Sequence, residues 1–228
     1  EIGTMTPKGQ PGNPKRRLFR LKADQGIINR MGFNNLGVDH LLEQVQAAQT
    51  DTLIGINIGK NVDTPVDKAL DDYLIGLEKS YPHADYITIN ISSPNTPGLR
   101  NLQFGEALDN LLSALKNRQA ELAEEFQRYV PMAVKVAPDL TLEEVQQLSE
   151  CFSRVGIDAV IATNTTLSRE AVAGLAHADE AGGLSGKPVF AKSTEIVRQF
   201  RQALPADMPI IAAGGIMSAE DAMQKLEA

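Results

Sequence analysis

The feature that most constrains this sequence is a run of β-branched residues at 86–91 that leads into a polar loop. Ile87 and Ile89 alternate with Thr88 and Asn90, which is the period of a pleated strand with one apolar face. The loop that follows contains two prolines, and a proline ends a sheet ladder because it has no N–H to donate. In α/β proteins, ligands are held at the carboxyl ends of strands. The stretch therefore predicts a buried strand that ends in a ligand site. An ordinary turn is the alternative, because Asn, Ser, Pro and Gly are also common turn residues.

Composition excludes several classes of protein. With 228 residues, 43% of them hydrophobic, the chain can bury a core and is expected to form one domain. A formal net charge of −7 argues against a nucleic-acid partner. No apolar run has the roughly 18 residues that a membrane span requires. The single Cys151 and three scattered histidines predict no disulfide and no metal site, and we expect a cytoplasmic setting.

From residue 53 onward, apolar strands alternate with amphipathic helices. Strands are predicted at residues 53–58, 86–91, 132–137, 159–163 and 209–213. Helices are predicted at residues 38–48, 64–80, 106–126, 142–152 and 194–204. Thr141 and Glu144 have the capping-box spacing for the fourth helix, and Ser218 begins a last helical segment. Alternation of this kind implies right-handed crossovers and a parallel sheet.

Polar residues or glycines follow one predicted strand after another. They are Asn57, Asn90 to Asn95, Lys135, Thr163 to Thr165, and Gly214 with Gly215. An open sheet concentrates its site at one switch point, whereas a (β/α)8 barrel gathers all its strand ends around one mouth. Together with a short strand at residues 1–2, the chain supplies about six of the eight strands. We therefore expect an incomplete (β/α)8 TIM barrel. Residues 1–228 would form the central part of a single domain, with one or two strands before it and one behind it.

Seven segments carry a resemblance to a known family. They are INRMGFNN at 28–35, GINIGKN at 55–61, NISSPNTPGLR at 90–100, VKVAPD at 134–139, IATNTT at 161–166, GGLSGKP at 182–188 and IIAAGGI at 210–216. In order and spacing they resemble dihydroorotate dehydrogenase over nearly the whole chain. Ser93 stands where a related class carries Cys, so the chain is similar to the membrane-associated, quinone-dependent class. The hairpin segment at residues 3–20, with Arg20 at the expected quinone entrance, supports the same class. The run at residues 18–21 predicts one strand of this surface hairpin.

The resemblance implies a reaction. The family oxidises dihydroorotate to orotate with FMN, in pyrimidine biosynthesis, and the quinone class passes the electrons to a quinone. Ser93 is expected to be the base that takes a proton from C5 of the substrate. A serine hydroxyl is a poor proton acceptor, so Thr96 and an ordered water are expected to pass the proton on, screened from bulk water by Phe33.

The resemblance also implies two sets of binding residues. The pyrimidine is expected to contact Asn29, Arg30, Met31, Gly32, Phe33, Asn90, Asn95, Asn164 and Thr165. FMN is expected to contact Thr4, Asn57, Asn90, Lys135, Thr163, Gly186 and Gly215. The amide side chains suit the alternating N–H and C=O groups of a pyrimidine. The Lys135 ammonium would stabilise the negative charge that arrives with a hydride, although a lysine in a buried strand could instead pair with a carboxylate.

Elements outside these residues are expected from the resemblance as well. Two N-terminal helices would receive the quinone and make peripheral contact with the membrane, at the cytoplasmic face of the inner membrane. A first strand with a lysine that contacts FMN, and a last βα unit that grips the phosphate, would also lie outside residues 1–228.

Two other functions are consistent with the residues. A lysine-dependent aldolase-type barrel could use Lys135 to form a Schiff base. Alternatively, the chain could be an inactive barrel fragment that serves as a structural module.

Overall fold

A six-stranded parallel sheet forms the centre of the molecule. The computed structural model describes residues 1–228, and the strands lie in the order β1-β6-β7-β8-β9-β11. Their bounds are β1 (Ile2–Met5), β6 (Gly55–Ile58), β7 (Tyr86–Asn90), β8 (Met132–Val136), β9 (Ala159–Ala162) and β11 (Ile210–Ala212). Every neighbouring pair is parallel. The sheet does not close, because β1 and β11 each have a neighbour on one side only. The prediction of an incomplete barrel of six strands is therefore confirmed.

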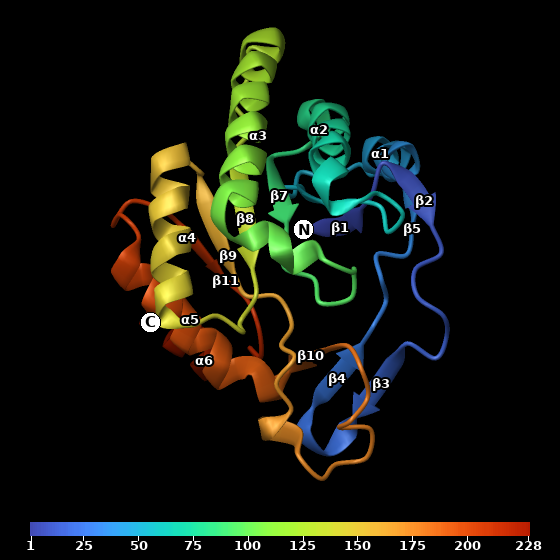
Figure 1. Ribbon diagram of the computed structural model, residues 1–228, viewed down its shortest axis with the longest axis vertical. Helices are drawn as coiled ribbons and strands as arrows, with labels where there is room; N and C mark the ends of the chain where they lie inside the picture. The colour runs from blue at the N-terminus through green and yellow to red at the C-terminus, as the bar shows by residue number, and fades with distance from the viewer.

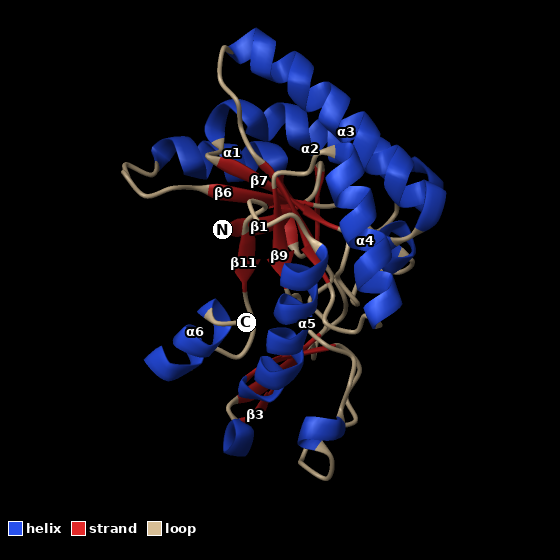
Figure 2. Ribbon diagram, turned by 90° about the vertical axis from the view of Figure 1, so that its left-hand side faces the viewer, coloured by secondary structure: helices blue, strands red, loops and turns tan.

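Helices follow the strands and pack outside them, as Figure 2 shows for α2 to α5. Their bounds are α1 (Val38–Ala47), α2 (Ala69–Ser80), α3 (Gly105–Phe126), α4 (Leu142–Val155), α5 (Phe190–Ala203) and α6 (Ala219–Leu226). Short 3-10 helices are η1 (Lys22–Asp24), η2 (Val66–Lys68), η3 (Tyr81–His83), η4 (Leu99–Gln103), η5 (Glu170–Val172) and η6 (Lys187–Val189). None of the helices is both long enough and apolar enough to cross a bilayer.

Two predicted helix starts are set by side-chain caps. The Thr141 hydroxyl accepts a hydrogen bond from the Glu144 N–H, and the Glu144 carboxylate accepts one from the Thr141 N–H. Ser218 caps α6 in the same way through the Asp221 N–H. Such caps satisfy backbone donors that a helix leaves free in its first turn. The helix predicted at 194–204 begins earlier, at Phe190, where no side chain caps it.

The central strands divide their side chains between two faces. Ile87 and Ile89 of β7 are fully buried against the helices in the main apolar core. Thr88 and Asn90 alternate with them and point to the inner face, where Lys135 of β8 also lies. This arrangement confirms the alternation predicted for the Tyr86 strand. It also places polar groups inside the sheet at the end where the loops begin.

A second, antiparallel sheet lies at the opposite end of the molecule from the tip of α3 (Figure 1). It contains β3 (Leu18–Leu21), β4 (Gly26–Asn29) and β10 (Gly183–Gly186). A two-stranded ladder joins β2 (Lys8–Gln10) to β5 (Asn35–Gly37). Only β3 is predicted from the sequence. The other strands are short and rich in Gly and Asn, so they carry no period-two signal.

Candidate active site

A cavity of about 170 Å³ opens at the carboxyl ends of the parallel strands. Twelve of the predicted site residues line it: Thr4, Asn29, Met31, Gly32, Phe33, Asn57, Asn90, Ser93, Asn95, Lys135, Asn164 and Thr165. They come from strands β1, β4, β6, β7 and β8, from the loops after β7 and β9, and from the segment after β4. Residues up to 161 positions apart therefore meet because parallel strands share one end of the sheet. A larger hollow, of about 730 Å³, lies elsewhere, between β1 and α1 at an open edge of the sheet.

Ser93 lies in the loop after β7 with 6% of its surface exposed. Its hydroxyl oxygen accepts a hydrogen bond of 3.2 Å from the Asn95 N–H. Thr96 is also buried, and its hydroxyl has no hydrogen-bond partner within the chain. A buried hydroxyl without a partner is costly unless a water satisfies it. The loop thus places the Ser93 hydroxyl in the cavity. Three residues later it carries the Thr96 hydroxyl, which is free to form hydrogen bonds.

Amide side chains are fixed around Ser93 by hydrogen bonds between loops. The Asn95 amide donates to the Asn29 carbonyl at 3.0 Å. The Asn164 amide donates to the Ser92 hydroxyl at 3.1 Å, and its oxygen accepts from the Thr165 N–H at 2.8 Å. These bonds join the loops after β4, β7 and β9. The cavity wall is therefore a set of oriented amides, which suits a planar ligand with alternating donors and acceptors.

Lys135 forms an ion pair with Glu1 inside the sheet. The ammonium lies 2.8 Å from one carboxylate oxygen, and the Glu1 carboxylate also accepts hydrogen bonds from Asn57 and Thr88. Burial raises the pKa of Glu1, but the Lys135 charge and the hydrogen bonds from Lys135, Asn57 and Thr88 together hold it below its ordinary value. Glu1 is a functional-site residue that sequence reasoning missed, because nothing in its local pattern shows that it faces Lys135.

Thr4 connects the side-chain amides of Asn57 and Asn90 on the inner face of the sheet. Its hydroxyl donates to the Asn57 side-chain oxygen at 2.7 Å and accepts from the Asn90 amide at 2.8 Å. The predicted FMN-contacting residues Thr4, Asn57 and Asn90 are thus joined in one chain of hydrogen bonds that ends at Glu1. A network of this kind fixes the rotamers of its members.

Phe33 occupies a strained backbone position at the rim of the cavity. Its φ of 52° lies in the left-handed region, where a non-glycine residue costs of order 1–2 kcal/mol. The Asn35 amide donates to the Phe33 carbonyl at 2.7 Å and stabilises this turn. The ring packs on Gly59, where an added Cβ would lie 3.1 Å from the ring. This backbone conformation places an apolar ring beside the polar cavity.

Five predicted residues do not line the cavity: Arg30, Thr96, Thr163, Gly186 and Gly215. The Arg30 side chain points away from it, because its guanidinium pairs with Glu180 at 2.8 Å and stacks on Phe19. Any contact of Arg30 with a ligand would therefore be through its backbone. Thr163 is buried, and its hydroxyl donates to the Asn164 carbonyl at 3.0 Å.

The two glycines lie at the start of α5. An added Cβ on Gly186 would meet the Gln25 carbonyl at 2.3 Å, and one on Gly215 would meet the Phe190 backbone at 2.6 Å. Close packing alone thus requires glycine at both positions. The backbone N–H groups of Gly215 and of its neighbour Gly214 have no acceptor within the chain. Successive free backbone N–H groups of this kind form a concave site for an anion such as phosphate.

A comparison with known proteins identifies the family. A family model described as dihydroorotate dehydrogenase matches residues 1–228. The chain belongs to the dihydroorotate dehydrogenase family. Two similar relatives, from Proteus mirabilis and Azotobacter vinelandii, are both named dihydroorotate dehydrogenase (quinone). Each is 60% identical over all 228 residues, which cover 68% and 66% of their respective lengths.

A solved structure shows that the likeness to the dihydroorotate dehydrogenase family extends to the fold. The crystal structure of DHODH from Eimeria tenella in complex with ferulenol superposes with a TM-score of 0.92 at 37% sequence identity. The match covers 99% of this chain and 65% of that one. The chain thus spans about two thirds of the length of the proteins it matches. The family resemblance predicted from the sequence motifs is confirmed.

Proposed function

We propose that this protein oxidises dihydroorotate to orotate with FMN and passes the electrons to a quinone, as a step of pyrimidine biosynthesis. The observation that carries the proposal is the content of one cavity, in which a buried serine, five asparagines and a lysine converge from several strand ends. The names of the relatives, which include the word quinone, support the choice of electron acceptor.

Ser93 is the proposed base. A proton leaves C5 of dihydroorotate for the Ser93 oxygen, and the hydrogen bond from the Asn95 N–H favours the deprotonated form of that hydroxyl. Thr96 has an unused buried hydroxyl that could pass the proton to a water. Phe33 closes one side of the cavity and keeps bulk water from this route.

Amides hold the pyrimidine in this proposal. Asn29, Asn95 and Asn164 lie around the cavity with their orientations fixed by the hydrogen bonds between loops. A ring with fixed donors and acceptors is bound in one orientation by such a wall, so that C5 faces Ser93. Thr165, Met31 and Gly32 complete the lining.

The residues present fit FMN. Lys135 places a cation on the inner face, and Thr4, Asn57 and Asn90 supply hydrogen-bonding groups beside it. The free N–H groups of Gly214 and Gly215 suit the phosphate. When bound, FMN supplies the hydride acceptor. Lys135 would stabilise the negative charge that the hydride brings, with Glu1 holding the ammonium in place.

The aldolase alternative is weakened by one contact. Lys135 lies in an ion pair with Glu1, and Schiff-base formation requires an uncharged amine. An ammonium held by a carboxylate is a poor nucleophile. Peripheral attachment to the cytoplasmic face of the inner membrane remains part of the proposal, and flotation of the protein with lipid vesicles tests it separately.

The decisive test of the function begins with the purified protein, expressed at the length of its curated relatives. We expect bound flavin, and we expect dihydroorotate to bleach the flavin absorbance under anaerobic conditions. Added quinone should then restore the absorbance. Protein without flavin, or a covalent substrate adduct trapped by borohydride on Lys135, would contradict the proposal and favour the aldolase or the inactive module.

A further inference from the structure

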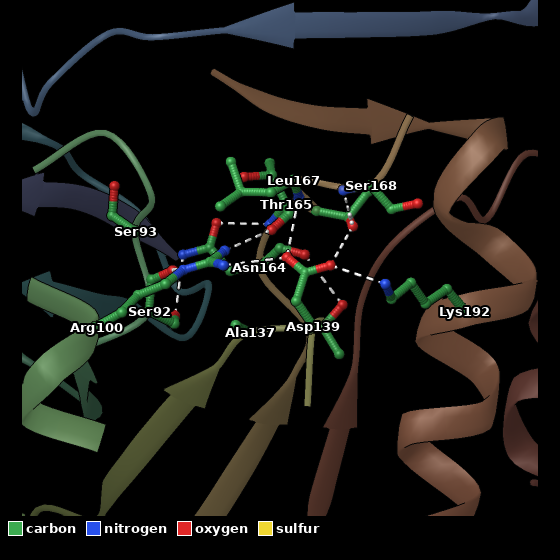
Figure 3. A network of polar contacts seen from close by, with 12 residues as sticks. Ser92, Ser93, Arg100, Ala137, Asp139, Asn164, Thr165, Leu167, Ser168 and Lys192 are labelled. Atoms are coloured by element: carbon green, nitrogen blue, oxygen red, sulfur yellow. Dashed lines mark hydrogen bonds and ion pairs between the residues drawn. The ribbon is translucent and has the colours of Figure 1, made fainter. Parts of the chain in front are cut away.

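Arg100 binds two backbone carbonyls that flank the site. Its Nε donates to the Ser92 carbonyl at 3.0 Å, and its Nη2 donates to the Thr165 carbonyl at 3.1 Å. No other group in the chain donates a hydrogen bond to either carbonyl. Figure 3 shows the guanidinium between these two segments. Arg100 itself does not line the cavity, so it acts on the site only through the backbone.

The positions of the two carbonyls are what makes this contact significant. Ser92 directly precedes the proposed base Ser93, and Thr165 directly follows Asn164. The Ser92 segment follows β7 and the Thr165 segment follows β9, and these strands are separated by β8. One planar guanidinium therefore spans the gap between two loops that share no ladder. Arginine suits this role because its donors form a rigid fork.

Asp139 fixes the third side of the guanidinium. It follows β8, and its carboxylate lies 3.1 Å from Arg100 and 2.9 Å from Lys192 of α5. The carboxylate also accepts hydrogen bonds from the Thr166 hydroxyl and the Leu167 N–H. The Arg100 and Asp139 side chains are only 21% and 19% exposed, so solvent screens this pair less than a surface pair. The guanidinium is thus held in one orientation.

We propose that Arg100, held by Asp139, is a positioning residue for the reaction. It sets the distance between the Ser93 hydroxyl and the Asn164 amide and Thr165 hydroxyl that orient the pyrimidine. The inference rests on the proposed function of Ser93 as the base. Misplacing a reacting group by about 1 Å can cost about 100-fold in rate. The loss should therefore appear in the chemical step. Bound flavin should be retained, because Arg100 bonds to Ser92, Asp139 and Thr165 and to none of the residues expected to hold FMN.

A matched control separates positioning from general structural support. Arg118 on α3 is also partly buried, with 29% exposure, and it binds the carboxylates of Glu78 and Glu121 at 2.7 Å. It lies outside the cavity. Removing either arginine breaks ion pairs of a similar kind, but only Arg100 bonds to the loops of the site.

The experiment measures the rate of flavin reduction by dihydroorotate in single turnovers. We expect Arg100→Ala to slow it about 30-fold to 100-fold with unchanged flavin content. Arg100→Lys keeps a charge for Asp139 but cannot span both carbonyls, so we expect about a tenfold loss, and this variant serves if Arg100→Ala fails to fold. Arg118→Ala should reduce flavin at the wild-type rate.

A double-mutant cycle with Ser93→Ala tests whether Arg100 acts through Ser93. If it does, adding Arg100→Ala or Arg100→Lys to Ser93→Ala should slow reduction by less than about threefold. Losses that multiply in the double variant would overturn the proposal, and so would single variants within about twofold of wild type. Failure of the wild-type protein to reduce flavin with dihydroorotate would instead contradict the proposed function. The two failures are therefore distinguishable.

Discussion

Strands β7 and β8 have two faces that differ in what they contact and in what they contribute. On the outer face, Ile87, Ile89 and Val134 are fully buried against the helices. On the inner face, Thr88 and Lys135 are bound by polar contacts with Glu1. Apolar burial stabilises the fold on one side, while the other side orients charges and amides. Because successive residues of a strand point to opposite faces, alternate residues of the same strand serve stability and the candidate site.

This comparison teaches where substitutions should act. An outer-face change removes packing and should lower stability while leaving the chemistry of each folded molecule intact. An inner-face change removes a positioned charge or hydroxyl and should lower activity with little loss of stability. The predictions below test this separation.

Ile89→Ala is expected to have the largest effect. The side chain is fully buried in the main core, so its truncation leaves a cavity and should lower the free energy of unfolding by about 3–4 kcal/mol. The rate of flavin reduction per folded, flavin-loaded molecule should stay near the wild-type value. Urea denaturation and single-turnover kinetics measure the two quantities. Ile75→Ala on α2, where the side chain is 39% exposed, is the control and should cost under about 1 kcal/mol.

Lys135→Gln tests the inner face of the neighbouring strand. We expect flavin reduction to slow about 100-fold, equivalent to about 2.7 kcal/mol, because the positive charge that stabilises the incoming hydride's charge is lost. Lys116→Gln is the matched control, since Lys116 has similar exposure at 18% and also pairs with a carboxylate, Asp158. Equal losses of activity in both variants would show that Lys135 has no special role.

Thr96→Val removes a hydroxyl that has no partner in the chain. Because no hydrogen bond of the chain is lost, stability should be unchanged or slightly higher. If Thr96 passes the proton from Ser93, flavin reduction should slow about tenfold. Ser80→Ala is an informative control: its buried hydroxyl is equally unpartnered, but it lies on α2 and not in the loop that carries Ser93. A wild-type rate in Thr96→Val would remove Thr96 from the proton route.

Asp139→Asn is expected to have the smallest effect on stability, a difference from wild type that is present at neutral pH and disappears in acid. Burial raises the pKa of Asp139, but hydrogen bonds from Thr166, Lys192 and the Leu167 N–H together hold it below its ordinary value of 3.8. A carboxyl with a lowered pKa in the folded state stabilises the protein above pH 3.8, and this contribution is lost as the pH falls through the folded-state value. Wild type should therefore lose more stability than the variant as the pH falls below about 5. Parallel curves in urea denaturation would contradict this account.

The sequence predicts the parallel sheet and much of the cavity for a physical reason. Alternation at Ile87 and Ile89 identifies a strand, and polar residues at successive strand ends converge in any parallel barrel. It could not predict the strands β4 and β10, because residues such as Gly183 and Gly186 carry no periodic signal.

The sequence also could not predict side-chain contacts between residues that are far apart in the chain. Glu1 meets Lys135 across 134 positions, and Arg100 meets Thr165 across 65. Arg100 and its partner Asp139 lie within the motifs at 90–100 and 134–139. The spacing of these motifs does not show which carbonyls the guanidinium reaches. For the same reason, the sequence could not show that the Arg30 side chain turns away from the cavity to pair with Glu180.

The most direct test of the central claim is the rate of flavin reduction by dihydroorotate in Ser93→Ala, measured anaerobically in single turnovers. Ser93 is the cavity-lining group to which the proposal assigns the proton from C5, so we expect the rate to fall about 100-fold or more with flavin content and unfolding free energy near wild type. Ser93→Cys should regain part of the activity at high pH, where a thiolate forms. A rate near wild type in Ser93→Ala at neutral pH would contradict the account, because the proton would then have another acceptor.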